Sequence, residues 1–517
     1  MISLHGMAER AARLNPTGMA TRYLGREFTL AETGERVARL ASGLGAWNLE
    51  EGERVAILSL NSDRYYESIF AVPWAGLCVV PLNTRWALPE NQYALKDSGS
   101  RILLFDDAFA DQAKQLLNDL DTLQAAIYMG EGECPDWAAA YETLIADNTS
   151  REPSARGDSE MAGIFYTGGT TGFPKGVMQS HMAIWASALG SLPEFGFTRE
   201  SCYLHAAPMF HMADFAGGMG VTLNCGTNVI LQSFDPAQVL AAFGEQRISH
   251  SLLVPAMIKM VLNHPDADSA DVSSMERIMY GASPMPAATL EQCMAKWPGV
   301  GLVQAYGQTE LAPVATLLST EDHVAGGERL KSAGRPSVIN EIRIVGDDGQ
   351  DCPQGVSGEV VVTGPHTMMG YWNKPEETAK ALQDGWVFTG DAGYFDEGGY
   401  LFIVDRVKDM VVTGGENVFT TEVENAIMSH DSVQDVAVIG IPHDEWGEAV
   451  HAIIILHPGK AVSEDDIIAH CRERIAGYKL PKGVTFREEP LPLSGAGKVL
   501  KTELRKPYWE GRDRQVN

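Results

Sequence analysis

Residues 166–176 read Tyr-Thr-Gly-Gly-Thr-Thr-Gly-Phe-Pro-Lys-Gly, and this stretch decides how the rest of the chain is interpreted. Three glycines and three threonines fall within residues 167–172, and Lys175 closes the stretch. Glycines let backbone N–H groups approach anionic oxygens, threonine hydroxyls add donors, and the lysine adds positive charge. The stretch therefore predicts a phosphate-binding loop rather than a plain turn. It is not a Walker A loop, because Lys175 follows proline and precedes glycine.

Around this loop, segments typical of strands alternate with segments typical of helices, a pattern that favours parallel sheets covered by helices. Residues 54–60 (RVAILSL) predict a buried strand, and Thr29 with Glu32 predicts a capping box at the start of the preceding helix. We expect further strands at residues 79–82, 102–105, 228–231, 251–254 and 302–304, and helices at residues 236–243 and 287–296. The predicted fold class is α/β.

The pattern changes near residue 405, after glycine-rich β segments at residues 355–362 and 398–404. A compact α+β pattern then starts afresh, with the following expected elements: a helix capped by Thr421 and Glu424 and running towards His430, strands at residues 433–441 and 450–456, and a helix from Ser463 to about Ile475. We therefore expect a large N-terminal domain with a β subdomain, residues 1–405, a linker at residues 405–408, and a small mobile C-terminal domain, residues 406–517.

Composition excludes several classes of protein. The chain of 517 residues is 45% hydrophobic and 21% charged, as in ordinary globular proteins, and its length fits two or more domains. Its 40 Lys and Arg residues against 68 Asp and Glu residues give a net charge of −28, which would repel nucleic acid and anionic membranes. The seven cysteines form no CxxC pair, which favours a reducing, cytoplasmic setting. The longest apolar run, residues 70–82, is shorter than the roughly 20 residues of a spanning helix, and residues 1–15 lack a signal sequence.

Five motifs, in order, resemble those of the adenylate-forming superfamily of acyl- and aryl-CoA synthetases, luciferases and peptide-synthetase adenylation domains. Residues 166–176 resemble its phosphate loop, and residues 306–310 (YGQTE) resemble its second adenylate motif. Residues 389–391 (TGD) with residues 400–406 resemble its ribose-binding part. Residues 412–417 (VTGGEN) resemble its thioester hairpin, and residues 492–498 (PLSGAGK) resemble its C-terminal lysine motif. The resemblance spans essentially the whole chain.

This resemblance implies that the protein uses ATP, CoA and Mg²⁺. Asp391 would accept hydrogen bonds from the ribose hydroxyls beside Arg406, and the hard carboxylate of Glu310 would hold magnesium. Lys498 would neutralise charge while the substrate carboxylate attacks the α-phosphorus, and Lys408 would be the hinge between the domains. The implied catalytic residues are Thr167, His211, Glu310 and Lys498. His211 follows apolar residues, and the family's residue here borders the acyl carboxylate.

The implied nucleotide site combines backbone, hydroxyl and charged donors: Thr167, Gly168, Gly169, Thr170, Thr171, Gly172, Lys175, Gly281, Ala282, Ser283, Tyr306, Gly307, Gln308, Thr309, Asp391, Arg406 and Lys498. The stretch from Gly281 also resembles the family's acyl-pocket loop. For CoA the resemblance implies Gly414, Gly415, Trp446, Tyr478 and Lys479. Gly168 departs from the serine of many members, which removes one hydroxyl contact to the pyrophosphate portion.

The expected activity is that of an AMP-forming carboxylic acid–CoA ligase, a cytoplasmic enzyme acting on a small carboxylic acid, and assembly as a homodimer stays open. Candidate pocket residues are small or apolar and favour a medium- or long-chain fatty acid: Met212, Ala213, Phe215, Gly217, Gly218, Met219 and Ala305. An aryl or hydroxycinnamic acid is the alternative, with Asp214 accepting from a substrate hydroxyl if it faces the pocket. Transfer to a carrier protein, luciferase-type oxidation and a nucleotide-binding sensor also remain open.

Overall fold

The computed structural model describes residues 1–167, 174–346, 348–406, 409–413, 416–443, 446–493 and 499–510. The chain separates into two compact units. The first is Met1–Ile342 with Val362–Val387, and the second is Arg343–Val361 with Phe388–Asn517. The boundary expected after residue 405 and the hinge at Lys408, which lies outside the described residues, stay predictions.

Two sheets form the framework of the first unit. One runs β19 (Gly370–Tyr371), β9 (Lys175–Ser180), β8 (Met161–Thr167), β4 (Cys78–Pro81), β3 (Arg54–Leu58), β5 (Ile102–Phe105), β6 (Ala125–Tyr128) and β7 (Ala139–Ala140). The other runs β16 (Arg335–Pro336), β15 (Val314–Leu318), β14 (Gly301–Gly307), β13 (Arg277–Gly281), β12 (His250–Leu252), β10 (Cys202–His205), β11 (Thr227–Ile230), β1 (Met19–Tyr23) and β2 (Arg26–Thr29). Most neighbours in their central parts are parallel, which confirms the α/β class.

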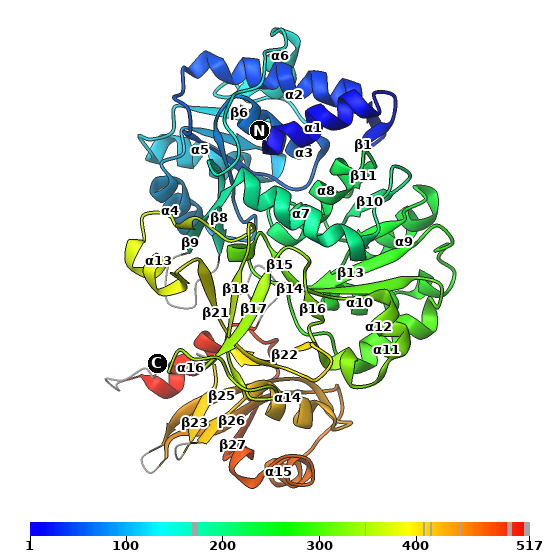
Figure 1. Ribbon diagram of the computed structural model, residues 1–517, viewed down its shortest axis with the longest axis vertical. Coiled ribbons are helices and arrows are strands. Elements are labelled where there is room, and N and C mark those ends of the chain that lie inside the picture. The colour runs from blue at the N-terminus through cyan, green and yellow to red at the C-terminus, as the bar shows by residue number, and fades with distance from the viewer. Residues whose placement is uncertain are drawn as a thin grey trace. The chain divides into compact units, whose positions relative to one another are not determined.

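The helices of the first unit cover these sheets (Figure 1). Their bounds are α1 (Leu4–Leu14), α2 (Leu30–Leu44), α3 (Asp63–Trp74), α4 (Leu88–Ser98), α5 (Ala110–Asp119), α6 (Tyr141–Ala146), α7 (His181–Phe195), α8 (Met212–Leu223), α9 (Pro236–Glu245), α10 (Pro255–Leu262), α11 (Ala287–Lys296), α12 (Thr320–Ala325) and α13 (Pro375–Ala381). At α2, Thr29 and Glu32 form the predicted capping box. One core cluster gathers side chains of α1, α2, α3, α7 and α8, so α8 lies deep in this unit.

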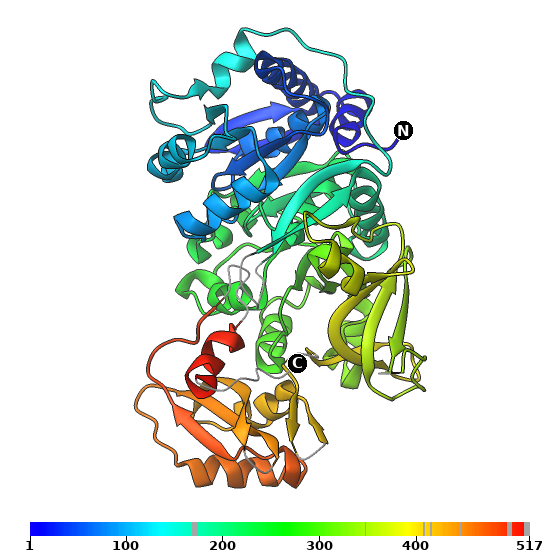
Figure 2. The ribbon, with the colours of Figure 1, turned by 90° about the vertical axis from the view of Figure 1, so that its left-hand side faces the viewer.

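In the second unit, β21 (Trp386–Phe395) pairs antiparallel with β22 (Leu401–Arg406), after β17 (Glu341–Val345) and β18 (Gly358–Thr363). A further sheet contains β24 (Glu416–Val418), β23 (Val411–Thr413), β26 (Gly447–Leu456), β25 (Val433–His443) and β27 (Gly483–Phe486). Figure 2 shows it between the orange-red α15 (Glu464–Arg472) and the red α16 (Lys501–Trp509). Alternate residues of β25 enter two separate clusters, because successive side chains of a strand point to opposite faces.

The start of α14 (Thr420–Met428) differs from the prediction. The expected capping box of Thr421 and Glu424 is wrong, because Glu424 instead accepts from the backbone N–H of Val438 (2.8 Å) and pairs with Lys501 (2.7 Å). Asp405, expected in a linker, lies in β22 and accepts from the hydroxyl of Thr420 (2.7 Å). The cap of α15 at Ser463 is confirmed. The half-buried ion pair of Glu424 with Lys501 and the carboxylate of Asp405 thus replace the local capping pattern.

Candidate active site

The predicted phosphate loop connects two antiparallel strands of the first unit. Thr167 at the end of β8 lies opposite Lys175 at the start of β9, and its hydroxyl donates to the Lys175 carbonyl (3.5 Å). The hairpin therefore fixes both ends of the loop. The other predicted loop residues, Gly168, Gly169, Thr170, Thr171 and Gly172, lie outside the described residues.

Glu310 follows β14 in a short 3-10 helix, Thr309–Leu311, and only 8% of its surface is exposed. Its Oε1 accepts a hydrogen bond from the hydroxyl of Tyr371 (2.7 Å), and its backbone carbonyl accepts from the N–H of Met368 (2.8 Å). Beside it, the Gln179 side chain donates to the Thr309 carbonyl (2.6 Å). Residues from β9 and β19 thus hold the second adenylate motif in place.

Lys175 and Glu310 converge on the same tyrosine. The Lys175 ammonium lies over the ring of Tyr371, 4.8 Å from its centroid, while the hydroxyl of that ring reaches Glu310. The structure therefore brings together two predicted site residues that are far apart in the sequence. Sequence reasoning missed Tyr371, because its position depends on the pairing of β19 with β9 and no local pattern signals it.

The surroundings of Glu310 fit a magnesium ion. Within the part of the chain that the structure describes, Oε2 of Glu310 makes no hydrogen bond, and no group of three or more His, Cys, Asp and Glu residues could hold a metal. Mg²⁺ commonly binds through one or two carboxylates together with substrate phosphates and water. A single carboxylate beside the hairpin that carries the predicted phosphate loop suits that mode of binding.

The strands β13 and β14 bring the remaining predicted adenylate residues together. They are parallel neighbours with Gly281 opposite Ala305, so Gly281, Ala282 and Ser283 leave the sheet beside Tyr306 and Gly307. A Cβ atom on Gly281 would lie 2.1 Å from the Ala305 carbonyl oxygen, and Ala282 has a φ of 64°. Only glycine permits this close approach of the two backbones. Gln308 and Thr309 follow directly after β14.

His211 and Asp214 lie at the start of α8, where His211 is the residue before the first turn. His211 is half-buried, and its backbone N–H donates to the Pro208 carbonyl (3.0 Å). Asp214 is fully buried and bonds to the Tyr203 hydroxyl (3.0 Å) and to Nδ1 of His205 (2.5 Å). Burial by itself would lower the pKa of His205, but the charge and hydrogen bond of Asp214, with a bond to Asn228, raise it above 6.5.

This hydrogen-bonded group joins both ends of α8. His205 bonds through Nε2 to Asn228 (3.0 Å), Asn228 bonds to the Tyr66 hydroxyl (3.3 Å), and that hydroxyl bonds to Thr222 in the last turn of the helix (2.7 Å). Asp214 therefore belongs to a buried network of protein side chains. This answers the question of its orientation that the sequence leaves open.

The glycines of α8 make room for this network. A Cβ atom on Gly217 would lie 2.4 Å from the Tyr203 hydroxyl, and one on Gly218 would lie 2.8 Å from the His205 ring. The space beside these two predicted pocket residues is therefore filled by protein rings. Met212, Phe215 and Met219 belong to the core cluster of the first unit, and the ring of Phe215 contacts Phe165 edge-on at 5.3 Å.

In the second unit, strand register places the predicted ribose ligands opposite each other. Asp391 in β21 faces Arg406 in β22, of which only the backbone is described. Asp391 is 4% exposed, and its N–H donates to the Thr389 hydroxyl (3.1 Å). Burial, together with the nearby charge of Asp391, raises the pKa of Glu359. Asp391 and Arg406 are thus paired across the β21–β22 hairpin.

The predicted CoA residues Trp446, Tyr478 and Lys479 differ from one another in their contacts and exposure. Trp446 stacks on His443 with ring centroids 4.2 Å apart, and the Lys482 ammonium lies 5.1 Å from the Trp446 ring centroid. Lys479 forms an ion pair with Glu422 (2.6 Å), and Tyr478 is 43% exposed. The other predicted groups of this part, Gly414, Gly415 and Lys498, lie outside the described residues. Their role towards CoA stays a prediction.

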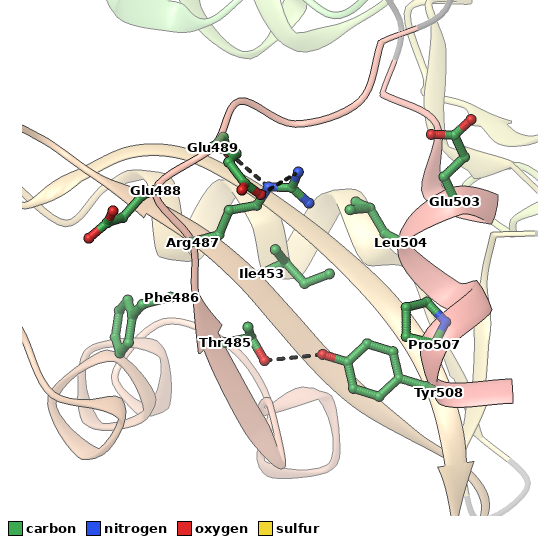
Figure 3. Close-up of a pocket in the computed structure, with 10 residues that line it drawn as sticks. All are labelled: Ile453, Thr485, Phe486, Arg487, Glu488, Glu489, Glu503, Leu504, Pro507 and Tyr508. Atoms are coloured by element: carbon green, nitrogen blue, oxygen red, sulfur yellow. Dashed lines mark hydrogen bonds and ion pairs between the residues drawn. The ribbon is translucent and has the colours of Figure 1, made fainter. Parts of the chain in front are cut away.

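A hollow of about 420 Å³ lies in the second unit between β27 and α16 (Figure 3). Thr485 and Tyr508 share a hydrogen bond across it (3.1 Å), and Arg487 forms an ion pair with Glu489 (3.4 Å). Its lining is distinct from the predicted site residues: Ile453, Thr485, Phe486, Arg487, Glu488, Glu489, Glu503, Leu504, Pro507 and Tyr508.

Comparison with known families supplies two matches. Residues 8–372 match the AMP-binding enzyme family, and residues 422–498 match the AMP-binding enzyme C-terminal domain. Together they span most of the chain, in the order that the motifs indicate.

Three curated relatives illustrate the range of substrates. Feruloyl-CoA synthase from Amycolatopsis is 38% identical over 96% of this chain and 98% of its own. A fatty acid–[acyl-carrier-protein] ligase from Streptomyces coeruleorubidus is 34% identical over 98% and 96%. A medium/long-chain fatty acid–CoA ligase from Mycobacterium tuberculosis is 34% identical over 95% and 87%.

Solved structures agree with the fold. The o-succinylbenzoate CoA synthetase from Bacillus subtilis, in complex with ATP and magnesium ion, has a TM-score of 0.84 at 30% identity, covering 96% of this chain and 98% of the other. A fatty acyl CoA synthetase from Mycobacterium tuberculosis has a TM-score of 0.79 at 32% identity, covering 98% of both chains. Among the residues described here, no helix combines the length and the apolar character needed to cross a membrane.

Proposed function

Because the chain belongs to the AMP-binding enzyme family and is an AMP-forming acid–CoA ligase, we propose that its substrate is an aromatic carboxylic acid of the hydroxycinnamate kind. The observation that carries this proposal is the 38% identity to feruloyl-CoA synthase along nearly the whole of both chains.

In the first half-reaction, an oxygen of the substrate carboxylate attacks the α-phosphorus of ATP, and pyrophosphate leaves. ATP and CoA are the co-substrates of this ligase family. Lys175 supplies positive charge at the hairpin that carries the phosphate loop, and Asp391 holds the ribose hydroxyls. Glu310 would hold Mg²⁺, which neutralises phosphate charge when bound. Lys498 meets the carboxylate and the α-phosphate.

In the second half-reaction, the thiol sulfur of CoA attacks the acyl carbonyl of acyl-AMP, the thiol proton is lost, and AMP leaves with its phosphate oxygen. Gly414 and Gly415 belong to this step, because a hairpin without side chains leaves room for the pantetheine arm. The small domain presents Lys498 in the first step and this hairpin in the second, turning about Lys408.

A medium- or long-chain fatty acid is the second candidate substrate. The 34% identity to a medium/long-chain fatty acid–CoA ligase supports it. Transfer of the acyl group to a carrier protein is the third candidate, supported by the similarly close acyl-carrier-protein ligase.

The deciding experiment is a panel of acids, namely ferulate, benzoate, decanoate and palmitate, assayed for ATP-dependent pyrophosphate release and for the CoA thioester. We expect ferulate to have the highest kcat/KM, about 10-fold or more above decanoate, since mismatched acyl groups lose about 1 to 3 kcal/mol. A higher kcat/KM for decanoate or palmitate would overturn the aromatic assignment. Thioester formed only on an added phosphopantetheinyl carrier, and none on CoA, would favour the third candidate.

The two half-reactions are tested separately. Lys498→Ala should lower acyl-AMP formation by about 10²- to 10³-fold and leave thioester formation from supplied acyl-AMP near wild type. Gly415→Leu should do the reverse, so acyl-AMP accumulates. Equal losses of both half-reactions in both variants would contradict the alternating small domain.

A further inference from the structure

Tyr371 occupies a position between two groups of the proposed ATP site. Its hydroxyl donates to Oε1 of Glu310 at 2.7 Å, and the Lys175 ammonium lies over its ring, 4.8 Å from the centroid. The residue is 9% exposed. One side chain therefore contacts an anionic and a cationic group through two different parts of its structure.

The segment around Tyr371 ties two motifs together. The N–H groups of Met369 and Trp372 donate to the carbonyls of Met178 (2.9 Å) and Gly176 (2.8 Å) in β9, and the N–H of Met368 donates to the Glu310 carbonyl (2.8 Å). The backbone of residues 368–372 thus holds β9, which begins at Lys175, against the turn that carries Glu310. The Tyr371 side chain makes a second connection between the same two elements, because it contacts both the Lys175 ammonium and the Glu310 carboxylate.

The hydroxyl contact with Glu310 and the ring contact with Lys175 differ in their chemistry, and each indicates a separate role. A neutral hydroxyl that donates to a carboxylate fixes the direction of its oxygens without neutralising the charge, so Oε2 of Glu310 stays available for a cation. The face of an aromatic ring attracts an ammonium and leaves its three N–H groups able to reach anionic oxygens. A carboxylate partner at the same place would compete with phosphate for Lys175.

We propose that Tyr371 is a positioning residue of the ATP site, which orients Glu310 for Mg²⁺ through its hydroxyl and Lys175 for phosphate through its ring. The inference rests on the proposed function of the site, but it concerns ATP and Mg²⁺ binding alone. It adds a residue that the sequence motifs do not contain, from the edge strand of the sheet.

The test measures binding of ATP by calorimetry at several Mg²⁺ concentrations, with no carboxylic acid and no CoA present. Tyr371→Phe keeps the ring and removes the hydroxyl, so the Mg²⁺ concentration needed for half-maximal ATP binding should rise about 10-fold. Affinity for ATP at saturating Mg²⁺ should stay within about 2-fold of wild type, because the ring still lies under Lys175. Tyr371→Leu should also weaken ATP binding at saturating Mg²⁺ by about 3- to 30-fold.

Tyr128→Phe is the matched control. It removes a tyrosine hydroxyl that donates to a carboxylate, that of Asp107, in the same sheet but in β6. This variant should keep the wild-type Mg²⁺ requirement. An unchanged requirement in Tyr371→Phe, or an equal change in Tyr128→Phe, would overturn the proposal. If Tyr371→Leu does not fold, Tyr371→Met, which also removes the ring, takes its place, because Tyr371→Phe decides the role of the hydroxyl only.

This test is independent of the acid substrate. An enzyme that makes no CoA thioester from any acid would refute the proposed function, whereas binding of ATP and Mg²⁺ would still report on Tyr371. Conversely, a normal Mg²⁺ requirement in Tyr371→Phe would refute the role of Tyr371 and leave the acid–CoA ligase intact.

Discussion

Two carboxylates of the first unit, Asp214 and Glu310, are both buried and both accept a hydrogen bond from a tyrosine hydroxyl. Asp214 also has His205 at 2.5 Å, so each of its oxygens bonds to a protein group. Glu310 has Tyr371 on one oxygen, and its other oxygen makes no hydrogen bond among the residues of the described ranges. Burial alone therefore does not separate a carboxylate with a structural role from one that is proposed to bind Mg²⁺.

Asp214 and Glu310 differ in the groups that bind their carboxylate oxygens. A buried carboxylate is stable when donors or cations meet its oxygens, and the protein provides all of them for Asp214. For Glu310, the proposed Mg²⁺ and its phosphates provide the rest. Loss of the first carboxylate should mainly cost stability, and loss of the second should mainly cost ATP chemistry.

The largest expected effect is on stability. Asp214→Ala removes the buried partner of both the Tyr203 hydroxyl and Nδ1 of His205, and should lower the free energy of unfolding of the first unit by about 3 to 5 kcal/mol, because each buried polar group left without a partner costs about 1 to 3 kcal/mol. Urea unfolding followed by tryptophan fluorescence measures this. A loss below about 1 kcal/mol would show that the network around α8 contributes little to stability, and that Asp214 and Glu310 do not differ in this respect.

The second effect is on metal-dependent activity. Glu310→Gln should raise the Mg²⁺ requirement of pyrophosphate release about 100-fold, because a neutral amide replaces the charged ligand. Its urea midpoint should stay near wild type. The exposed Glu200 provides the matched control, since Glu200→Gln should change neither quantity. Activity of Glu310→Gln that is independent of Mg²⁺ would contradict the assignment.

The third effect concerns a carboxylate of the second unit, Asp391. Asp391→Ala should weaken ATP binding by about 1.5 to 3 kcal/mol, since it removes a charged acceptor of ribose hydroxyls. Asp396→Ala in the same hairpin is the control, because Asp396 accepts from the N–H groups of Gly398 and Tyr400 and holds the turn. Calorimetry should show normal ATP affinity in the control. Equal affinities in both variants would reject Asp391 as a ribose ligand.

The smallest expected effect is a pH dependence. The pKa of His205 is raised in the folded protein, so its pairing with Asp214 stabilises fully below pH 6.5 and this contribution is lost as pH rises through the folded-state pKa. The free energy of unfolding should therefore fall as pH rises above 6.5, and it should fall more steeply than in Asp214→Asn, in which His205 has no charged partner. Unfolding curves from pH 6 to pH 9 check this. Parallel pH profiles of the two proteins would contradict a charged pair.

Much of the framework follows from local sequence patterns. The strand β5 and the helix α11 have the predicted bounds, because an apolar run of four residues and an amphipathic run of ten are each sufficient signals. The capping box of α2 is confirmed for the same reason. At α14 the local signal fails, since Glu424 is used by Lys501 and Val438. Local patterns hold where no distant partner competes.

The class of fold, the order of the motifs and the residue types suited to phosphate and magnesium follow from the sequence, because these depend on neighbours along the chain. The tertiary structure alone decided that Asp214 faces His205 and Tyr203, and that Tyr371 joins Lys175 to Glu310. Each of these contacts depends on how strands and helices pack around the side chain. The partners of a buried charge are set by that packing, which a linear pattern of residues does not encode.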